Sequence, residues 1–348
     1  MKILQLVGSP VSNFYEKLSR LYAKDAIEAL GQNDRYEFLI AYVTKEGWRF
    51  PVSLAQADID RAAILSLASA IARLEQERVD VALPQMFCLP GMTVYRSLLE
   101  VLQIPYIGNT GSLMALAADK AKTKAIVSSV GVQVPRGEIL CKHQQPSLSP
   151  PVVVKPVDAD NSIGVSLVRQ ESEYSKALAV AWRESDRVLV EEFIPGREVR
   201  CGVLDLGDGL ICLPLEEYPI DPDYPIRTVE SKIRATETGE LYLTAKDPSK
   251  AWIVHPQDDC MTLKVWEVAK LCHRALGCRH YSLFDLRINP GGEIYFLEAG
   301  LYCSFSPKSV IVTMARSAGI DLGDLFAKML TTARRGYASN SPGMSGGS

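Results

Sequence analysis

Residues 285–300 read DLRINPGGEIYFLEAG, two short runs of alternating apolar residues on either side of Asn-Pro-Gly-Gly. This pattern predicts a β-hairpin whose turn is set by the proline and the glycines. A carboxylate stands near each open end of the hairpin, Asp285 on the first strand and Glu298 on the second. Two acids on a half-buried hairpin need either contact with solvent or a partner of opposite charge.

The spacing of these two acids depends on the length of the turn. A two-residue turn would pair Asp285 with Phe296, and both carboxylates would lie on one face as diagonal neighbours about 7–8 Å apart. Two carboxylates at this spacing can share Mg²⁺, which takes oxygen ligands and leaves room for substrate phosphates. A three-residue turn would instead put Asp285 and Glu298 on opposite faces. A solvated, charged face of the hairpin explains the same letters.

Length and composition indicate a globular protein of more than one domain. The chain has 348 residues, of which 47% are hydrophobic and 23% charged, and this length exceeds what one core supports. The net charge of −3 argues against nucleic acid or an anionic membrane as the main partner. No apolar run suits a signal peptide or a membrane span. The eight cysteines form no C-x-x-C motif, so reduced thiols and a cytoplasmic location are expected.

Strand and helix patterns divide the chain into segments. They alternate over residues 1–108, which predicts a parallel sheet with helices on its faces. A helix is then predicted from Ser112, its N-cap, to a stop at Gly131. Residues 219–252 are rich in acids and prolines, and such a long irregular segment is typical of a functional lid or a disordered excursion. The Ser/Gly/Asn-rich tail over residues 337–348 is predicted to be disordered.

A second candidate site is the segment VVVKPVDADNSIGVS, in which Lys155 closes an apolar strand. The loop after it contains Asn161, Ser162 and Gly164. Small residues let backbone N–H groups approach phosphates, and the lysine would neutralise their charge. The segment has no Walker A motif, and an ordinary hairpin loop also accounts for it.

A third candidate site is the segment VLVEEFIPGREV, where acids interrupt a predicted strand at Glu191 and Glu192 and return at Glu198. These carboxylates could accept hydrogen bonds from an amine or a ribose hydroxyl, although an edge strand with a charged outer face fits the same pattern. Lys120 stands midway along the helix predicted from Ser112. Taken alone, it is interpreted as a solvated lysine.

Taken in chain order, these pieces resemble the ATP-grasp superfamily, and residues 1 to about 335 resemble its D-alanine–D-alanine ligase family. The segments AADKAKTKAIVSSVGVQVP, VVVKPVDADNSIGVS and FDLRINPGGEIYFLEAG carry the resemblance. It implies an α/β (α+β) ATP-grasp fold with a Rossmann-like N-terminal parallel sheet. Three domains are implied: a substrate-side domain over residues 1–108, a central subdomain with the phosphate loop over 109–196, and a C-terminal subdomain with the lid and the magnesium hairpin over 197–336.

The resemblance also implies ATP and Mg²⁺ as cofactors and assigns residues to them. The phosphates would be met by Lys120, by Lys155, by the loop residues Asn161, Ser162 and Gly164, and by Lys232 of the lid, which would reach the γ-phosphate. Adenine would be held by Glu191, Glu192, Phe193 and Ile194, the ribose by Glu198, and Mg²⁺ by Asp285 and Glu298.

Several positions depart from the pattern of the dipeptide ligases. Leu283 stands where they have an arginine, Gly300 where they have an asparagine, Ser304 where they have a glycine and Ile233 where they have the lid tyrosine. An arginine aimed at the oxyanion of acyl transfer stabilises the developing charge by a few kcal/mol. Its loss at Leu283 predicts a reaction that forms no such oxyanion.

The segments PQMFCLPGMT, IPYIGNT and KPVDADNSIGVSLV further resemble the D-Ala–D-Ala ligase-like branch of mycosporine-like amino acid biosynthesis. This resemblance implies ATP-dependent condensation of mycosporine-glycine with a small amino acid, threonine or serine. The product would be an iminomycosporine such as porphyra-334 or shinorine, formed through a phosphorylated ring oxygen with release of ADP and phosphate. Amine attack on that ring forms no oxyanion, because the ring nitrogen carries positive charge instead.

We expect PQMFCLPGMT and EAGLYCSFSPKS to line the pockets for the ring and the amino acid. The candidate catalytic residues are Lys232, Ser304, Lys308 and Ser309, with Ser306 as a further carboxylate partner. Two alternatives stay open: a true D-alanine–D-alanine ligase that dispenses with the arginine, and a non-catalytic ATP-binding module. The expected partners are small molecules, with no nucleic acid and no membrane, and a homodimer is possible because related ligases are commonly dimers.

Overall fold

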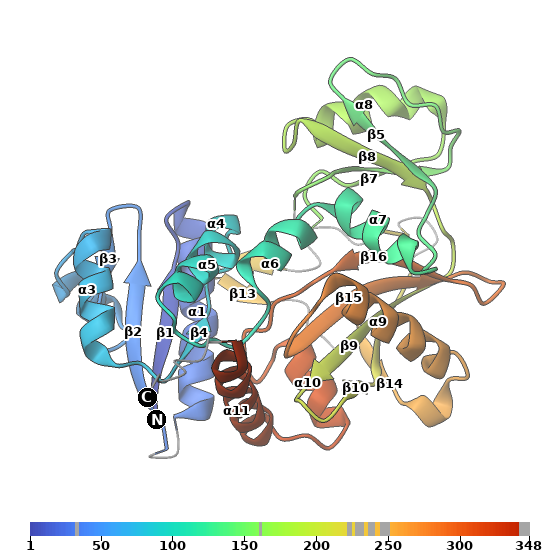
Figure 1. Cartoon of the computed structure of the whole chain (residues 1–348). Helices are drawn as coiled ribbons and strands as arrows, with labels where there is room; N and C mark the ends of the chain where they lie inside the picture. The colour runs from blue at the N-terminus through green and yellow to red at the C-terminus, as the bar shows by residue number, and fades with distance from the viewer. Residues whose placement is uncertain are drawn as a thin grey trace, which may run out of the picture.

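The computed structural model describes residues 1–31, 35–159, 162–220, 225–226, 233–235, 241–243 and 251–340. An N-terminal sheet with its helices lies on one side of the molecule, and two further sheets lie on the other (Figure 1). The helices α6 (Gly111–Ala117) and α7 (Lys120–Ser129) join the two sides. In the described residues, none of the helices combines the length and apolar character needed to cross a membrane.

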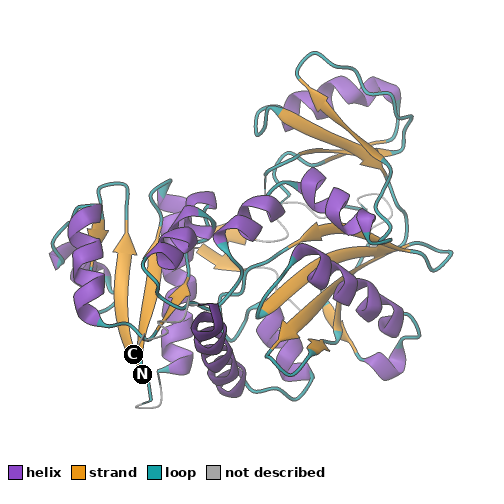
Figure 2. Cartoon of the chain, viewed as in Figure 1, coloured by secondary structure: helices purple, strands orange, loops and turns teal. Residues whose placement is uncertain are grey.

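The N-terminal sheet has the strand order β3-β2-β1-β4, with β1, β2 and β4 parallel and β3 antiparallel to β2. Its elements are β1 (Lys2–Gly8), α1 (Asn13–Leu30), β2 (Glu37–Val43), β3 (Trp48–Arg49), α2 (Gln56–Arg61), α3 (Leu67–Glu77), β4 (Val81–Pro84), α4 (Leu89–Met92) and α5 (Val94–Val101). Helices cover both faces (Figure 2). Ile3 therefore packs in the core that contains α1, while Leu4 packs in the core that contains α3 and α5.

A small antiparallel sheet with the order β5-β8-β6-β7 follows in the chain. It consists of β5 (Gly137–Cys141), β6 (Val152–Pro156), β7 (Ser166–Val168) and β8 (Arg187–Glu192), with η1 (Glu171–Glu173) and α8 (Tyr174–Ala181) between β7 and β8. Valines of β6 and β8 pack with α8 in one core. Val153, Lys155 and Glu191 lie on the other face of this sheet and line a cleft.

The largest sheet has the order β14-β11-β9-β15-β16, with β10 paired to β9. The remaining elements are β9 (Arg197–Asp205), β10 (Leu210–Cys212), β11 (Leu215–Tyr218), the β12 (Ile233–Ala235) and β13 (Leu241–Leu243) pair, β14 (Trp252–Val254), η3 (Pro256–Asp258), α9 (Thr262–Leu276), β15 (Tyr281–Ile288), β16 (Ile294–Ala299), α10 (Val310–Ser317) and α11 (Leu322–Asn340). Apolar residues on one face of the sheet pack with α7 and α9. Gly277 ends α9 in the left-handed conformation, with φ at 68°, as its position in the sequence predicts.

The single helix predicted from Ser112 to Gly131 is wrong in two respects, its N-cap and its continuity. The helix predicted from Ser112 is two helices: Thr110, not Ser112, caps α6 by accepting a hydrogen bond from Leu113 N–H at 3.1 Å. Asp119 caps α7 by accepting from Lys122 N–H at 3.0 Å. Lys120 is therefore the first residue of α7 and not midway along a helix, because an aspartate N-cap begins a new helix at that point.

The C-terminal end of α11 also differs from the expectation. The helix continues to Asn340, so the predicted disorder is wrong for residues 337–340, while residues 341–348 lie outside the described residues. Gly336 does not stop the helix, since a glycine in a helix interior costs only about 1 kcal/mol relative to alanine. The proposed domain boundaries stay a prediction.

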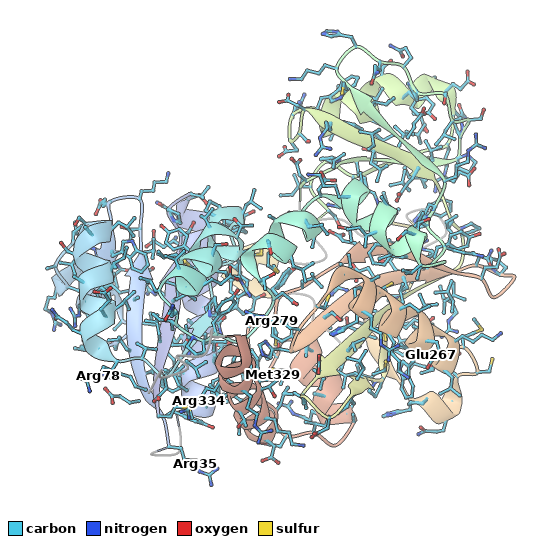
Figure 3. The ribbon with its side chains drawn as sticks, viewed as in Figure 1. Arg35, Arg78, Glu267, Arg279, Met329 and Arg334 are labelled. Carbon is cyan, nitrogen blue, oxygen red and sulfur yellow. The ribbon has the colours of Figure 1, made fainter. Side chains whose placement is uncertain are left out.

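The two sides of the molecule share one core. Ile3 and Leu83 of the N-terminal sheet belong to the same cluster of buried residues as Phe305, Phe326 and Met329. Arg279 and Met329 lie where the two sides meet (Figure 3). This shared core holds the N-terminal sheet against α10, α11 and the segment that follows β16.

Asn109 lies in the linker between α5 and α6, and the hydrogen bonds of its side chain hold this linker in place. Its side-chain amide donates to the carbonyls of Tyr281 at 2.9 Å and Leu301 at 3.1 Å. Its side-chain oxygen accepts from Arg279 N–H at 2.9 Å, and Asn109 is fully buried. The linker is thereby fixed to the first residue of β15 and to the end of the hairpin.

We expect Asn109→Ala to lower the free energy of unfolding by about 3 kcal/mol, because it leaves two buried carbonyls and the partly buried N–H of Arg279 without their partner. Urea denaturation followed by circular dichroism measures this loss. Asn13→Ala is the matched control, since Asn13 is exposed, and it should change stability by less than about 0.5 kcal/mol. Equal stability of the two variants would contradict the anchoring role of Asn109.

Candidate active site

The hairpin of β15 and β16 has a three-residue turn. Asn289 N–H donates to Glu293 O at 3.0 Å, and Gly292 N–H donates to Asn289 O at 2.9 Å. Gly292 has φ at 81°, the left-handed conformation that closes a three-residue hairpin loop. The predicted two-residue turn is therefore wrong.

The two acids nevertheless lie on one face, because a β-bulge follows in the second strand. Leu286 pairs with Phe296, but the next pair is Asp285 with Glu298, so Leu297 is an extra residue. The bulge reverses the effect of the longer turn. Asp285 and Glu298 are direct cross-strand partners, for which Cβ atoms are about 4.5–5.5 Å apart, and not the predicted diagonal neighbours.

The face of the large sheet opposite α9 carries successive rows of side chains. Glu198 pairs with Arg287, and Arg200 pairs with Asp285, which faces Glu298 across the hairpin. The next row along contains Gly202, paired with Leu283. Neighbouring rows are about 7 Å apart. The charged rows therefore give way to a small and apolar row within one step along the strands.

A cleft, whose volume of about 810 Å³ includes open solvent, lies between the small sheet and these charged rows. Ten of the residues predicted from the sequence line it: Lys120, Lys155, Ser162, Glu191, Glu192, Phe193, Ile194, Glu198, Asp285 and Glu298. Gly164 packs beside Pro156, where a Cβ atom would come within 2.7 Å of the proline ring. Lys232 and Asn161 lie outside the described residues.

The start of α7 connects the phosphate loop to the hairpin. Lys120 N–H donates to Val157 O at 3.0 Å, and its ammonium group donates to Ala159 O. The same ammonium group lies 3.4 Å from Glu298 Oε1. Lys120 thus places one positive charge between the loop and one of the hairpin carboxylates.

Glu191 lies between two lysine side chains at the back of the cleft. Its carboxylate forms ion pairs with the ammonium groups of Lys155 and Lys124, the latter at 2.7 Å. Burial raises the pKa of the Glu191 carboxyl, but the two ammonium groups outweigh burial and hold the pKa below its ordinary value. Burial lowers the pKa of Lys124 to about 8, although Glu191 opposes this shift.

Asp285 and Glu198 also have cationic partners. Arg200 Nε donates to Asp285 Oδ1 at 2.6 Å, and Arg200 Nη1 lies 3.7 Å from Glu216 Oε2. Arg287 donates to Glu198 and, at 3.0 Å, to Pro225 O. Within the described ranges, no group of three or more His, Cys, Asp or Glu side chains is arranged to hold a metal ion. The hairpin itself contributes two carboxylates to the cleft, Asp285 and Glu298.

The sequence does not predict three cationic residues of this site: Lys124, Arg200 and Arg287. Lys124 follows Lys120 by four residues, and Arg287 follows Asp285 by two, so helix and strand periodicity could have placed each beside its neighbour. Arg200 comes from β9, and its contact with Asp285 depends on strand pairing. That pairing has no signal in a single sequence.

The candidate catalytic residues Ser304, Lys308 and Ser309 lie outside this cleft, on the segment between β16 and α10. The carbonyl of buried Ser304 accepts a hydrogen bond from Gln85 Nε2 at 2.7 Å. The rings of Phe87 and Tyr302 are 5.9 Å apart. The two segments expected to line the substrate pockets are therefore in contact with each other.

Ser306 and Leu283 complete the surroundings of this second region. Ser306 Oγ donates to Asp25 Oδ2 at 2.9 Å, which ties the segment to α1. Leu283 is 8% exposed and belongs to the apolar cluster with Cys303 and Phe305. Its carbonyl accepts from Gly300 N–H at 2.8 Å. Position 283 thus contributes an apolar side chain beside the charged rows.

Comparisons with known proteins identify relatives of the chain. The family described as D-ala D-ala ligase C-terminus matches residues 132–331. A D-alanine–D-alanine ligase from Geotalea uraniireducens is 32% identical over 269 residues, which cover 75% of this chain and 80% of that protein.

Solved structures share the fold. The D-Ala:D-Ser ligase VanG from Enterococcus faecalis superposes with a TM-score of 0.75 at 21% identity, covering 95% of this chain and 99% of that chain. A D-alanine–D-alanine ligase from Bacillus anthracis complexed with ATP gives a TM-score of 0.71 at 21% identity, covering 98% of this chain and all (100%) of that chain. These likenesses confirm the predicted α/β fold of the ATP-grasp type.

The buried charges of the cleft lead to a stability prediction. Glu191→Gln removes the carboxylate between two buried ammonium groups, and we expect the free energy of unfolding to fall by about 3–5 kcal/mol. Glu192→Gln is the matched control, because its side chain is 46% exposed, and it should cost less than about 1 kcal/mol. A urea titration that gave both variants the same stability would contradict the ion-pair assignment.

Proposed function

The chain belongs to the D-alanine–D-alanine ligase family of ATP-grasp ligases, and on this premise we propose that its cleft binds MgATP to drive formation of a carbon–nitrogen bond. The enzyme would activate an oxygen of one substrate by phosphorylation and join that substrate to the amine of an amino acid, releasing ADP and phosphate. One observation carries the proposal. Lys120, Lys155, Asp285 and Glu298, from four separate elements, line one cleft.

The cleft supplies groups for each part of the nucleotide. The ammonium groups of Lys120 and Lys155 would neutralise phosphate charge, and the loop at Ser162 would bring backbone N–H groups to the same phosphates. Residues 191–194 would hold adenine, and Glu198 would take the ribose. The Bacillus anthracis protein of the same fold is described as complexed with ATP, which supports ATP as the ligand.

The hairpin fits Mg²⁺. Asp285 and Glu298 provide oxygen ligands side by side on one face, and Mg²⁺ is usually held by one or two carboxylates together with waters and substrate phosphates. Positive charge is already accommodated there, because Arg200 and Lys120 lie beside the two carboxylates. Asp285 and Glu298 would hold the ion, which would supply positive charge against the negative charge that develops during phosphoryl transfer.

The first candidate reaction is the formation of D-alanyl-D-alanine. Relatives that are about 30% identical over three quarters of the chain bear the name D-alanine–D-alanine ligase. The comparisons therefore favour this reaction. The alternative of a non-catalytic ATP-binding module has no comparable support.

The second candidate is the condensation of mycosporine-glycine with threonine or serine, and position 283 favours it. Leu283 is buried among apolar residues, where the resemblance to the dipeptide ligases leads us to expect an arginine. A tetrahedral oxyanion next to this leucine would lack a positively charged donor from that position. Attack of an amine on a phosphorylated ring conjugated to nitrogen needs no such donor.

A cytoplasmic location is a further part of the proposal, because ATP and free amino acids are available there. A homodimer is another part, because related ligases are commonly dimers. Small molecules would be the substrates, with no nucleic acid or membrane involved. Residues of the segment between β16 and α10, among them Ser304, Lys308 and Ser309, would bind the amino-acid carboxylate. Lys232 of the lid would reach the γ-phosphate.

ADP release separates the two candidate reactions. The protein is incubated with MgATP and either D-alanine alone or mycosporine-glycine with threonine or serine, and ADP is measured by a coupled assay. Robust release with D-alanine, with the dipeptide found by mass spectrometry, would establish the first reaction and exclude the second. Release only with mycosporine-glycine and an amino acid would establish the second.

Removal of either hairpin carboxylate should stop turnover with whichever substrate is used. We expect Asp285→Asn and Glu298→Gln each to lower the rate of ADP release about 100-fold or more, because one oxygen ligand of the ion loses its charge. Glu293→Gln, on the exposed turn of the same hairpin, is the control and should leave the rate within twofold. Unchanged turnover in the Asp285 and Glu298 variants would refute the magnesium site.

A further inference from the structure

Lys124 is a buried lysine that stands behind the cleft. It lies one helical turn after Lys120 in α7, and its side chain is 7% exposed. Its ammonium group pairs with Glu191 Oε2 at 2.7 Å and donates to Phe296 O at 3.4 Å. Among the described residues, those that line the cleft do not include Lys124. A direct contact with a ligand in the cleft is therefore not its role.

Glu191 is shared between this lysine and a second one. Lys155 pairs with Glu191 Oε1, and its side chain lines the cleft. The Glu191 side chain is 3% exposed, so water contributes little to its solvation. Each carboxylate oxygen thus has one ammonium partner, Lys155 in front and Lys124 behind.

The two lysines would respond differently to an anion in the cleft. Lys155 lines the cleft, and its ammonium group would move toward a phosphate. If Lys155 were the only partner of Glu191, this movement would leave a buried carboxylate without a counter-charge, which is costly. With Lys124 in place, Glu191 keeps one ion pair while Lys155 contacts the phosphate.

We propose that Lys124 is a positioning residue of the nucleotide site, which holds Glu191 and so frees Lys155 to bind a phosphate. The inference rests on the proposed function, because it requires that the cleft bind MgATP. Lys124 acts through two other residues and touches no substrate. If Lys124 only stabilised the fold, the folded Lys124→Gln and Lys124→Arg variants would bind MgATP with the same affinity.

Binding of MgATP to the full-length protein tests the inference. Isothermal titration calorimetry at pH 7.5, without the amino-acid substrate, is applied to wild type, Lys124→Gln, Lys124→Arg and Lys264→Gln. We expect a Kd that is 10- to 100-fold higher for Lys124→Gln and within threefold of wild type for Lys124→Arg. Lys264→Gln, at an exposed position of α9, should not change the Kd.

The outcomes distinguish the proposed function from the role of Lys124. A wild-type protein that binds no MgATP would refute the proposed function. Wild-type binding together with an unchanged Kd in Lys124→Gln would overturn the role of Lys124 alone. Thermal unfolding of each variant shows whether Lys124→Gln is folded, and if it is not, the pH dependence of the other proteins decides.

The pH dependence of MgATP binding provides that second test. The charged groups facing the Lys124 ammonium are Glu191 of β8, Lys155 of β6 and Glu298 of β16, and burial lowers the pKa of Lys124 to about 8. Its charge is present below this pH and is lost above it. The affinity of wild type should therefore fall above pH 8, by at most about tenfold per pH unit for one linked proton.

Lys124→Arg keeps its charge throughout this range, so its affinity should stay constant from pH 7.5 to 9.5. The difference between the two profiles is the signature of Lys124. A wild-type affinity that is constant up to pH 9.5, or a decline of equal size in Lys124→Arg, would overturn the inference.

Discussion

The β-bulge at Leu297 is the constraint on which the cleft depends. With the three-residue turn and no bulge, Glu298 would point to the face that packs against α7 and α9, among apolar side chains. The extra residue returns Glu298 to the face of Asp285. Only in that register can Glu298 approach the ammonium group of Lys120, which in turn contacts the phosphate loop at Ala159. One inserted residue thus brings the hairpin, α7 and the small sheet to the same site.

The charges of the cleft are arranged in pairs that a ligand can exchange. Asp285 contacts Arg200, Glu198 contacts Arg287, and Glu191 contacts Lys155. Each pair satisfies groups that would be costly to bury alone. A magnesium nucleotide would bring a cation to Asp285 and an anion to Lys155, so that neither of these two pairs would leave an isolated charge. Second partners further from the cleft, Glu216 behind Arg200 and Lys124 behind Glu191, would make this exchange easier.

The sequence predicts the fold and most of the cleft, because its motifs follow one another in the order of a known superfamily. It does not predict the turn of the hairpin, since Asn-Pro-Gly-Gly suits loops of two or three residues and the bulge at Leu297 has no local signal. The sequence predicts Lys120 midway along a helix, because the helical pattern continues on both sides of Asp119, the N-cap of α7. It does not predict Arg200, since only the pairing of β9 with β15 brings this residue to Asp285. The sequence predicts the substrate less well than the proposed nucleotide site, because Leu283 and Ser304 are not the residues that the resemblance to the dipeptide ligases leads us to expect.

A crystal structure of the protein with ADP, Mg²⁺ and a phosphate analogue would show whether Asp285 and Glu298 hold the metal of a nucleotide bound in the cleft. We expect a metal ion with an oxygen of each carboxylate at about 2.0–2.1 Å. We also expect phosphates beside Lys120 and Lys155, and Arg200 moved away from Asp285. A nucleotide bound in the cleft with its metal coordinated by neither carboxylate, or a nucleotide bound elsewhere, would contradict this expectation.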